Sequence, residues 1–272
     1  MRSGTTPQNG ATGRRILPPI PTEHGAWVML TAGVLTPLAV VVARGMPADG
    51  VLWAFVAFVV LAVLALLFRE ALRRRGIRDA PAARRRLLLI AVVEVVAILF
   101  VAAGLALQVG PVWILAAAAV PAVVLDLRVR KTGWPVPLGG ELSGLCALSI
   151  VVPAGAVLLR LDSRTAGLLW LLFLAFHVGS VIRVQSLLSA TGRRGELFRR
   201  ASLSYHGVAL LAVTGGWYGG LLGLGAPVAF AVAGGRTLVA GGEATPALKT
   251  VGRREGLLST LFVVTAPWLV VF

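Results

Sequence analysis

Polar side chains interrupt the long apolar run at residues 165–190, and the spacing of three of them is suited to chemistry. His177, Ser180 and Arg183 follow one another at intervals of three residues, so a helix places them near one face. An arginine at the centre of a membrane helix costs roughly 2.5–3.5 kcal/mol on insertion scales, and such residues normally face the interior of a bundle. Histidine titrates near neutral pH, and arginine binds phosphate oxygens. The spacing therefore predicts a buried site that binds a polar group and transfers protons.

The composition is that of an integral membrane protein. Of the 272 residues, 57% are hydrophobic and only 14% are charged, whereas soluble domains have about 25% charged residues. The net charge is +15, and the basic residues behind it lie between the apolar runs. We therefore expect these residues to set the membrane topology and to contact anionic lipid, and we expect no nucleic-acid partner. Cys146 is the single cysteine, which excludes a disulfide framework.

Apolar segments predict an all-α polytopic bundle of about nine transmembrane helices. A spanning helix needs about 20 residues, so the segments 111–126 and 257–272 are short, and 226–240 could instead be re-entrant. Residues 1–20 are polar and rich in Gly and Pro and predict a disordered cytoplasmic tail without a cleavable signal. Residues 21–272 then form one bundle. The nine segments are 25–43, 51–68, 87–107, 111–126, 138–159, 165–190, 202–223, 226–240 and 257–272.

The basic residues predict the orientation of this bundle. All but four of the 26 lysines and arginines lie in the N-terminal tail or in the even-numbered connections. The exceptions are Arg183 within a helix and three residues of the opposite side, Arg44, Arg160 and Arg164. Such a bias marks the cytoplasmic side. We therefore expect a multi-pass protein of the cytoplasmic membrane with its N-terminus in the cytoplasm.

Most other ionisable residues also fall in the cytoplasmic half of the expected helices. Glu94 lies about seven residues into its helix, which is roughly 10 Å. A channel or carrier needs polar groups along its length or at the midplane, so this asymmetry favours a one-sided cavity for a lipid-like, anionic ligand. The candidate catalytic residues are His177, His206 and Glu94. The candidate ligand-binding residues are His24, Arg183, Ser180, Asp126, Lys131, Glu141 and Tyr205.

Each of these residues also has a purely structural interpretation. Glu23 and His24 could only cap a helix at the interface, and Glu94 could only neutralise Arg183. Asp126 could form an interfacial ion pair with Arg128. The chain contains no P-loop, no His-Glu-x-x-His motif and no Cys-x-x-Cys motif, so we expect no metal site made of such ligands.

Three blocks of sequence resemble the YwiC-like family of bacterial membrane proteins. They are PTEHGAW at residues 21–27, His177-Val178-Gly179-Ser180 with Arg183, and Ser204-Tyr205-His206. The resemblance extends from about Pro18 to the C-terminus. It implies a bacterial inner-membrane protein and assigns no activity.

The expected architecture is also similar to that of the UbiA superfamily of intramembrane prenyltransferases. The similarity rests on residues 126–132 (DLRVRKT) and 137–140 (PLGG), which resemble the basic turn and the start of the fifth helix in UbiA proteins. This resemblance implies magnesium and a prenyl diphosphate held by two Asp-rich motifs. Here the second connection offers only Glu70 and Asp79, and the sixth only Glu196. Magnesium prefers carboxylate and phosphate oxygens, so Arg and His donors would have to hold the anion directly.

Three functions follow as hypotheses. The first is a protein that binds an isoprenoid or another amphiphilic ligand, and that transfers a prenyl group if it is an enzyme. The second is a transporter, which requires a polar path to the far side. The third is a non-catalytic assembly factor for a respiratory membrane complex.

Overall fold

The computed structural model describes residues 24–46, 55–60, 62–64, 66–67, 138–188, 192–239 and 248–271. Throughout these ranges the regular structure is helical, and a single antiparallel bridge joins Leu222 to Val270. The expected all-α class is thus confirmed. The helices are α1 (His24–Ala43), α5 (Gly139–Ser149), α6 (Val151–Leu158), α7 (Ser163–Leu188), α8 (Gly192–Tyr218), α9 (Gly225–Val239) and α10 (Leu248–Thr265), and a 3₁₀ turn, η2 (Ala266–Trp268), follows α10.

Three stretches of the described chain are long and apolar enough to cross a membrane. They are Gly25–Ala43, Glu141–Leu158 and Ser163–Leu188, and they coincide with three of the predicted segments. The predicted total of nine includes segments that lie outside the described residues, so the total is not confirmed.

The predicted segment 138–159 is divided into α5 and α6 at Ile150. Pro153 explains the break, because proline has no N–H and its ring collides with the carbonyl group four residues earlier, here that of Ser149. The Ser149 side chain is buried at this break; its hydroxyl donates to the Cys146 carbonyl oxygen at 2.8 Å and accepts a hydrogen bond from Trp170 Nε1–H of α7 at 2.9 Å.

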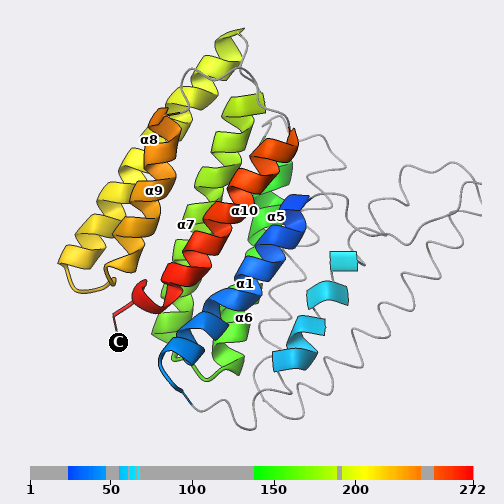
Figure 1. Ribbon diagram of the computed structural model, residues 1–272, viewed down its shortest axis with the longest axis vertical. Helices are drawn as coiled ribbons and strands as arrows, with labels where there is room; N and C mark the ends of the chain where they lie inside the picture. The colour runs from blue at the N-terminus through cyan, green and yellow to red at the C-terminus, as the bar shows by residue number, and fades with distance from the viewer. Residues whose placement is uncertain are drawn as a thin grey trace, which may run out of the picture.

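Two helices begin about ten residues earlier than their apolar segments. α8 starts at Gly192 and α10 at Leu248, so residues expected in cytoplasmic connections are helical. In α8 the polar first turns are held by Glu196, which accepts hydrogen bonds from Arg199 and Arg200 at 2.7–2.8 Å. Ion pairs at these spacings stabilise exposed helices. The first turns of α8 extend beyond the ends of the other helices (Figure 1).

α7 lies in the centre of the described bundle. It contacts α5 and α6 on one side and α8 and α9 on the other, and α1 packs against α6 and α10 (Figure 1). The largest core cluster is shared by α1, α6, α7, α9 and α10 and includes the fully buried rings of Phe173 and Phe262. The polar residues of α7 are therefore surrounded by protein on several sides.

Candidate ligand-binding cavity

A cavity of about 280 Å³ lies between α1, α5, α7 and α10. Its lining comes from the first turns of α1, α5 and α10 and from the second half of α7. These parts meet at one end of the bundle, which is the predicted cytoplasmic end. Most of the wall is apolar, and the polar part consists of Glu141, His177, Ser180, Gln185, Glu255 and Ser259.

His177 and Ser259 form a hydrogen-bonded pair in the wall of this cavity. His177 Nδ1 lies 2.9 Å from the carbonyl oxygen of Phe173. A carbonyl oxygen can only accept, so Nδ1 carries the proton and Nε2 of the neutral ring is an acceptor. Ser259 Oγ–H then donates to His177 Nε2 at 3.2 Å. The pair joins α7 to α10 across 82 residues.

Buried aromatic rings lie beyond this pair, towards the other end of the bundle. The ring centroid of Phe173 is 4.1 Å from that of His177 and 5.8 Å from that of Phe262. Phe176 lies between Phe262 and Phe230, at 4.9 and 5.6 Å. Phe173 is one turn before His177 on α7, and Phe262 follows Ser259 on α10. Because these helices run in opposite directions, both rings close the cavity on the same side.

Arg183 is buried but is not part of the cavity wall. Arg183 comes one turn after Gly179, so it lies on the side of α7 that contacts His206 of α8, and the charges of Arg183, Arg236 and Glu255 all act on His206. Arg236 Nη2 of α9 pairs with Glu255 Oε1 of α10 at 2.8 Å. Glu255 also lines the cavity, so it connects the cavity to this second polar cluster.

Gly179 allows α8 to approach α7 closely. A Cβ atom at this position would lie 3.0 Å from His206 Nε2 and 3.1 Å from Tyr205 Cε1. The Tyr205 hydroxyl donates to the carbonyl oxygen of Ala175 at 2.7 Å, and His206 Nδ1–H donates to that of Ser202 at 2.7 Å. The Tyr205 hydrogen bond therefore joins α8 to α7, that of His206 stays within α8, and neither side chain lines the cavity.

The structure thus divides the predicted site residues into groups. His177, Ser180 and Glu141 line the cavity, while Arg183, Tyr205 and His206 lie at the α7–α8 contact. His24 begins α1, and its side chain is outside the described part of the chain, as are Glu94, Asp126 and Lys131. Among the described residues, no group of three His, Cys, Asp or Glu side chains could hold a metal ion.

Sequence reasoning missed the contribution of α10, namely Glu255 and Ser259. Glu255 lies before the last predicted segment, 257–272, and Ser259 is the third residue of that segment; neither was considered as a site residue. Their spacing of four residues, which puts them one turn apart on one side of a helix, was the signal available. Arg236 was likewise treated only as a topology determinant.

A family described as YwiC-like protein matches residues 20–156. No curated protein and no solved structure matches the chain. The match includes the PTEHGAW block and the helices α1, α5 and most of α6, and it ends before α7. Since it covers half of the 272 residues, and since apolar spanning helices form the described bundle, this membrane protein belongs to the YwiC-like family.

Proposed function

We propose that this membrane protein binds the polar head of an amphiphilic ligand, an isoprenoid or another lipid, in the cavity between α1, α5, α7 and α10. The observation that carries the proposal is the polar wall of a mostly apolar cavity at one end of the bundle. Ligand sites generally combine apolar walls with a few convergent polar groups. At about 280 Å³, the cavity suits a head group and the first part of a chain.

The charges of the wall refine the expected ligand. Glu141 and Glu255 line the cavity, and Arg183 does not. The charge of Glu255 is paired with Arg236, so Glu141 and the histidine are the groups that favour a head group that donates hydrogen bonds, because an anion beside a carboxylate is repelled. The described wall therefore supports a neutral or cationic head group better than the anionic one expected from Arg183 and His24. For the same reason it supports transfer of a prenyl diphosphate less well than binding.

A cavity-filling substitution tests this proposal. Gly252 lines the cavity, and a Cβ atom there meets nothing within 4 Å, so we expect the larger side chain of Gly252→Leu to fill part of the cavity. Gly207→Leu is the matched control, because Gly207 is exposed on α8 with equally open space around it. Each protein is purified in detergent, and the retained lipids are identified by mass spectrometry.

We expect one lipid class to be enriched with the wild type and with Gly207→Leu and to be lost with Gly252→Leu. Absence of any enriched lipid, or equal retention by all three proteins, contradicts the proposal. Gly252→Leu must elute as a monodisperse peak, which separates loss of binding from loss of folding.

The distribution of arginines supports a cytoplasmic opening of the cavity in a bacterial inner membrane. The cavity end of the described bundle carries exposed arginines of α8 and α10, and the other end carries Arg44, Arg160 and Arg164. Arg200→Cys and Arg160→Cys, each in a Cys146→Ala background, distinguish the two sides by labelling of intact cells with an impermeant thiol reagent. We expect labelling of the second variant only, since positive residues stay inside. The exposed arginines of the cavity end are Arg199, Arg200, Arg253 and Arg254.

Transport is the second candidate function, and a hollow at the opposite end of the bundle favours it. This hollow of about 450 Å³ lies among residues such as Arg44, Val228 and Thr265. The aromatic rings of Phe173, Phe176 and Phe262 separate it from the cavity. A carrier must open this barrier, so a cysteine at Ser180 would react from both sides of the membrane. Reaction from the cytoplasmic side alone supports ligand binding.

A further inference from the structure

Several helical hydroxyls of the described chain donate to a carbonyl oxygen of their own helix, whereas the hydroxyl of Ser259 donates to a side chain of another helix. The hydroxyls of Thr36, Thr237 and Thr265 donate to the carbonyl oxygen four residues earlier in their own helices. The neighbouring Thr260 does the same towards Gly256. Ser259 instead donates across the bundle to His177 Nε2. Its proton therefore points to a base, Nε2 of a neutral imidazole, and not to a backbone carbonyl oxygen.

The three groups of an activated serine nucleophile, namely a hydroxyl, a base and an acceptor that orients the base, are therefore hydrogen-bonded in a chain. A serine hydroxyl donates to an imidazole, and the imidazole is fixed in the required tautomer by a second acceptor, the carbonyl oxygen of Phe173. This is the arrangement in which a histidine removes the proton of a nucleophile. Both side chains are buried, with exposed fractions of 1% for His177 and 5% for Ser259.

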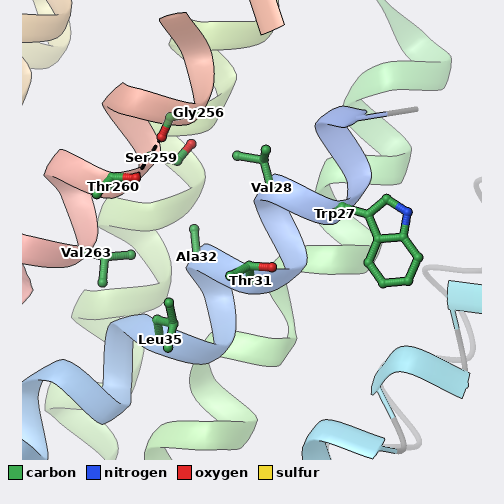
Figure 2. A pocket seen from close by; sticks show the side chains of 9 residues that line it. All are labelled: Trp27, Val28, Thr31, Ala32, Leu35, Gly256, Ser259, Thr260 and Val263. Carbon is green, nitrogen blue, oxygen red and sulfur yellow. Dashed lines mark hydrogen bonds between the residues drawn. The ribbon is translucent and has the colours of Figure 1, made fainter. Parts of the chain in front are cut away.

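Ser259 also lies where two hollows meet. The cavity is on one side, and on the other is a groove of about 370 Å³ between α1 and α10. Figure 2 shows Val28, Ala32 and Leu35 of α1 opposite Ser259 and Val263 of α10. Val28 and Ser259 are the residues that line both hollows. A ligand that passes Ser259 can therefore place a chain in the apolar groove and a polar part in the cavity.

We propose that Ser259 is a nucleophile activated by His177 and that the ligand is an acyl ester of an amphiphilic alcohol. This inference rests on the proposed function and adds a reaction to it. Ser259 Oγ attacks the ester carbonyl carbon while its proton passes to His177 Nε2. The bond from that carbon to the alkoxy oxygen breaks, and the alcohol leaves with the proton from Nε2. Water, or a second alcohol, then releases the acyl group from Ser259 in the same way.

The wall of the cavity suits such a substrate. An ester is uncharged, so the Glu141 carboxylate does not repel it, and the carboxylates of Glu141 and Glu255 can accept hydrogen bonds from an alcohol head group. Ser180, one turn after His177 on α7, also lines the cavity, and its hydroxyl can donate a hydrogen bond to an oxyanion.

An alkyl fluorophosphonate tests the inference, because it phosphonylates an activated serine with loss of fluoride. The full-length protein in detergent is treated with the probe, and the adduct is located by peptide mass spectrometry. We expect one adduct, at Ser259. Labelling should vanish in Ser259→Ala and should slow by roughly 10²-fold in His177→Gln, in line with the contribution of a general base. Ser186→Ala is the control, because the hydroxyl of this buried serine donates to the carbonyl oxygen of Arg183, and its labelling should equal that of the wild type.

Two results overturn the inference. One is the absence of an adduct on Ser259 in monodisperse wild-type protein, and the other is a labelling rate that His177→Gln does not change. The adduct site is mapped on the wild type, so misfolding of a variant cannot produce the first result. If lipid retention is lost in Gly252→Leu while Ser259 stays unlabelled, the binding proposal holds and the nucleophile is wrong. If Ser259 is labelled and no lipid is retained, the nucleophile is confirmed and the lipid-binding proposal is wrong.

Discussion

Gly179 sets how closely α7 and α8 can pack. Its α-hydrogen faces His206 and Tyr205, and a Cβ atom there would be 3.0–3.1 Å from both rings. Gly179→Ala therefore forces the rings outward and lengthens the bond from Tyr205 to the Ala175 carbonyl oxygen. We expect a loss of about 1–3 kcal/mol in unfolding free energy, the usual cost of overpacking.

The control for this prediction lies on the same helix. A Cβ atom at Gly167 meets nothing within 4 Å, so Gly167→Ala should be neutral or stabilising, by up to about 1 kcal/mol from helix propensity. Denaturant titration of both variants in detergent measures the difference. Equal stability of the two variants would show that the close approach at Gly179 does not matter.

The pair formed by Arg236 and Glu255 predicts a measurable coupling between α9 and α10. The side chains are 22% and 17% exposed, and their nitrogen and oxygen atoms are 2.8 Å apart. Removal of one partner leaves a poorly solvated charge. Arg236→Gln and Glu255→Gln should each destabilise the protein, and the double variant should recover part of the loss. We expect a coupling energy of about 0.5–3 kcal/mol from a double-mutant cycle; strictly additive effects would mean that the pair contributes nothing.

At the scale of elements, Asp162 defines where α7 begins. Its Oδ1 accepts from the backbone N–H of Thr165 at 2.9 Å, and its Oδ2 accepts from the Thr165 hydroxyl at 2.6 Å. Such a cap satisfies donors that a helix start leaves unbonded. The sequence predicted a short connection here, and the structure shows that this connection also orients the start of the helix that carries His177.

We therefore expect Asp162→Ala to cost about 1 kcal/mol at neutral pH. The hydrogen bonds from Thr165 hold the pKa of Asp162 below its ordinary value of 3.8. Stabilisation by the carboxylate is then present above that value and is lost as the pH falls through the lowered pKa. Unfolding midpoints of wild type and variant should differ at pH 7 and converge below 3.8. A difference that grows on acidification would exclude this role.

The extension of α8 has a similar electrostatic cause. Hydrogen bonds from Arg199 and Arg200 lower the pKa of Glu196 to about 2. The carboxylate thus remains ionised and continues to pair with both arginines at any physiological pH. Ion pairs between charged side chains can stabilise helical turns outside the membrane. A prediction from hydropathy alone misses these polar turns and places the start of the helix too late in the sequence.

At the scale of the whole molecule, the end of the chain connects the α8–α9 pair to the rest of the bundle. Gly223 N–H donates to the Leu269 carbonyl oxygen at 3.0 Å, beside the bridge between Leu222 and Val270. A Cβ atom at Gly223 would overlap the Trp268 carbonyl oxygen. Gly223→Ala should therefore break this contact and speed amide hydrogen exchange in residues 266–271.

Gly215→Ala serves as the control, because a Cβ atom there meets nothing within 4 Å. Exchange in residues 266–271 should match the wild type in this variant. Slow exchange in Gly223→Ala as well would show that the C-terminal residues are held by other contacts.

The sequence by itself determined the class of the protein and much of its local structure. Apolar runs of spanning length require helices, since a backbone in lipid must satisfy its own hydrogen bonds, and the starts and ends of α1 and α7 agree with the predicted segments to within a few residues. The polar residues His177, Ser180 and Arg183 were predicted to avoid lipid, and all three are buried.

Only the tertiary structure decided which neighbours these residues meet. In an α-helix, a residue three positions later falls about 60° short of a full turn around the helix axis. Two such steps separate His177 from Arg183, so their side chains point about 120° apart around α7. That rotation is enough to place His177 against Ser259 of α10 and Arg183 towards α8 and α9. Periodicity gives the position of a side chain on its own helix. The identity of the facing helix depends on packing between segments far apart in the chain, such as the 82 residues between His177 and Ser259.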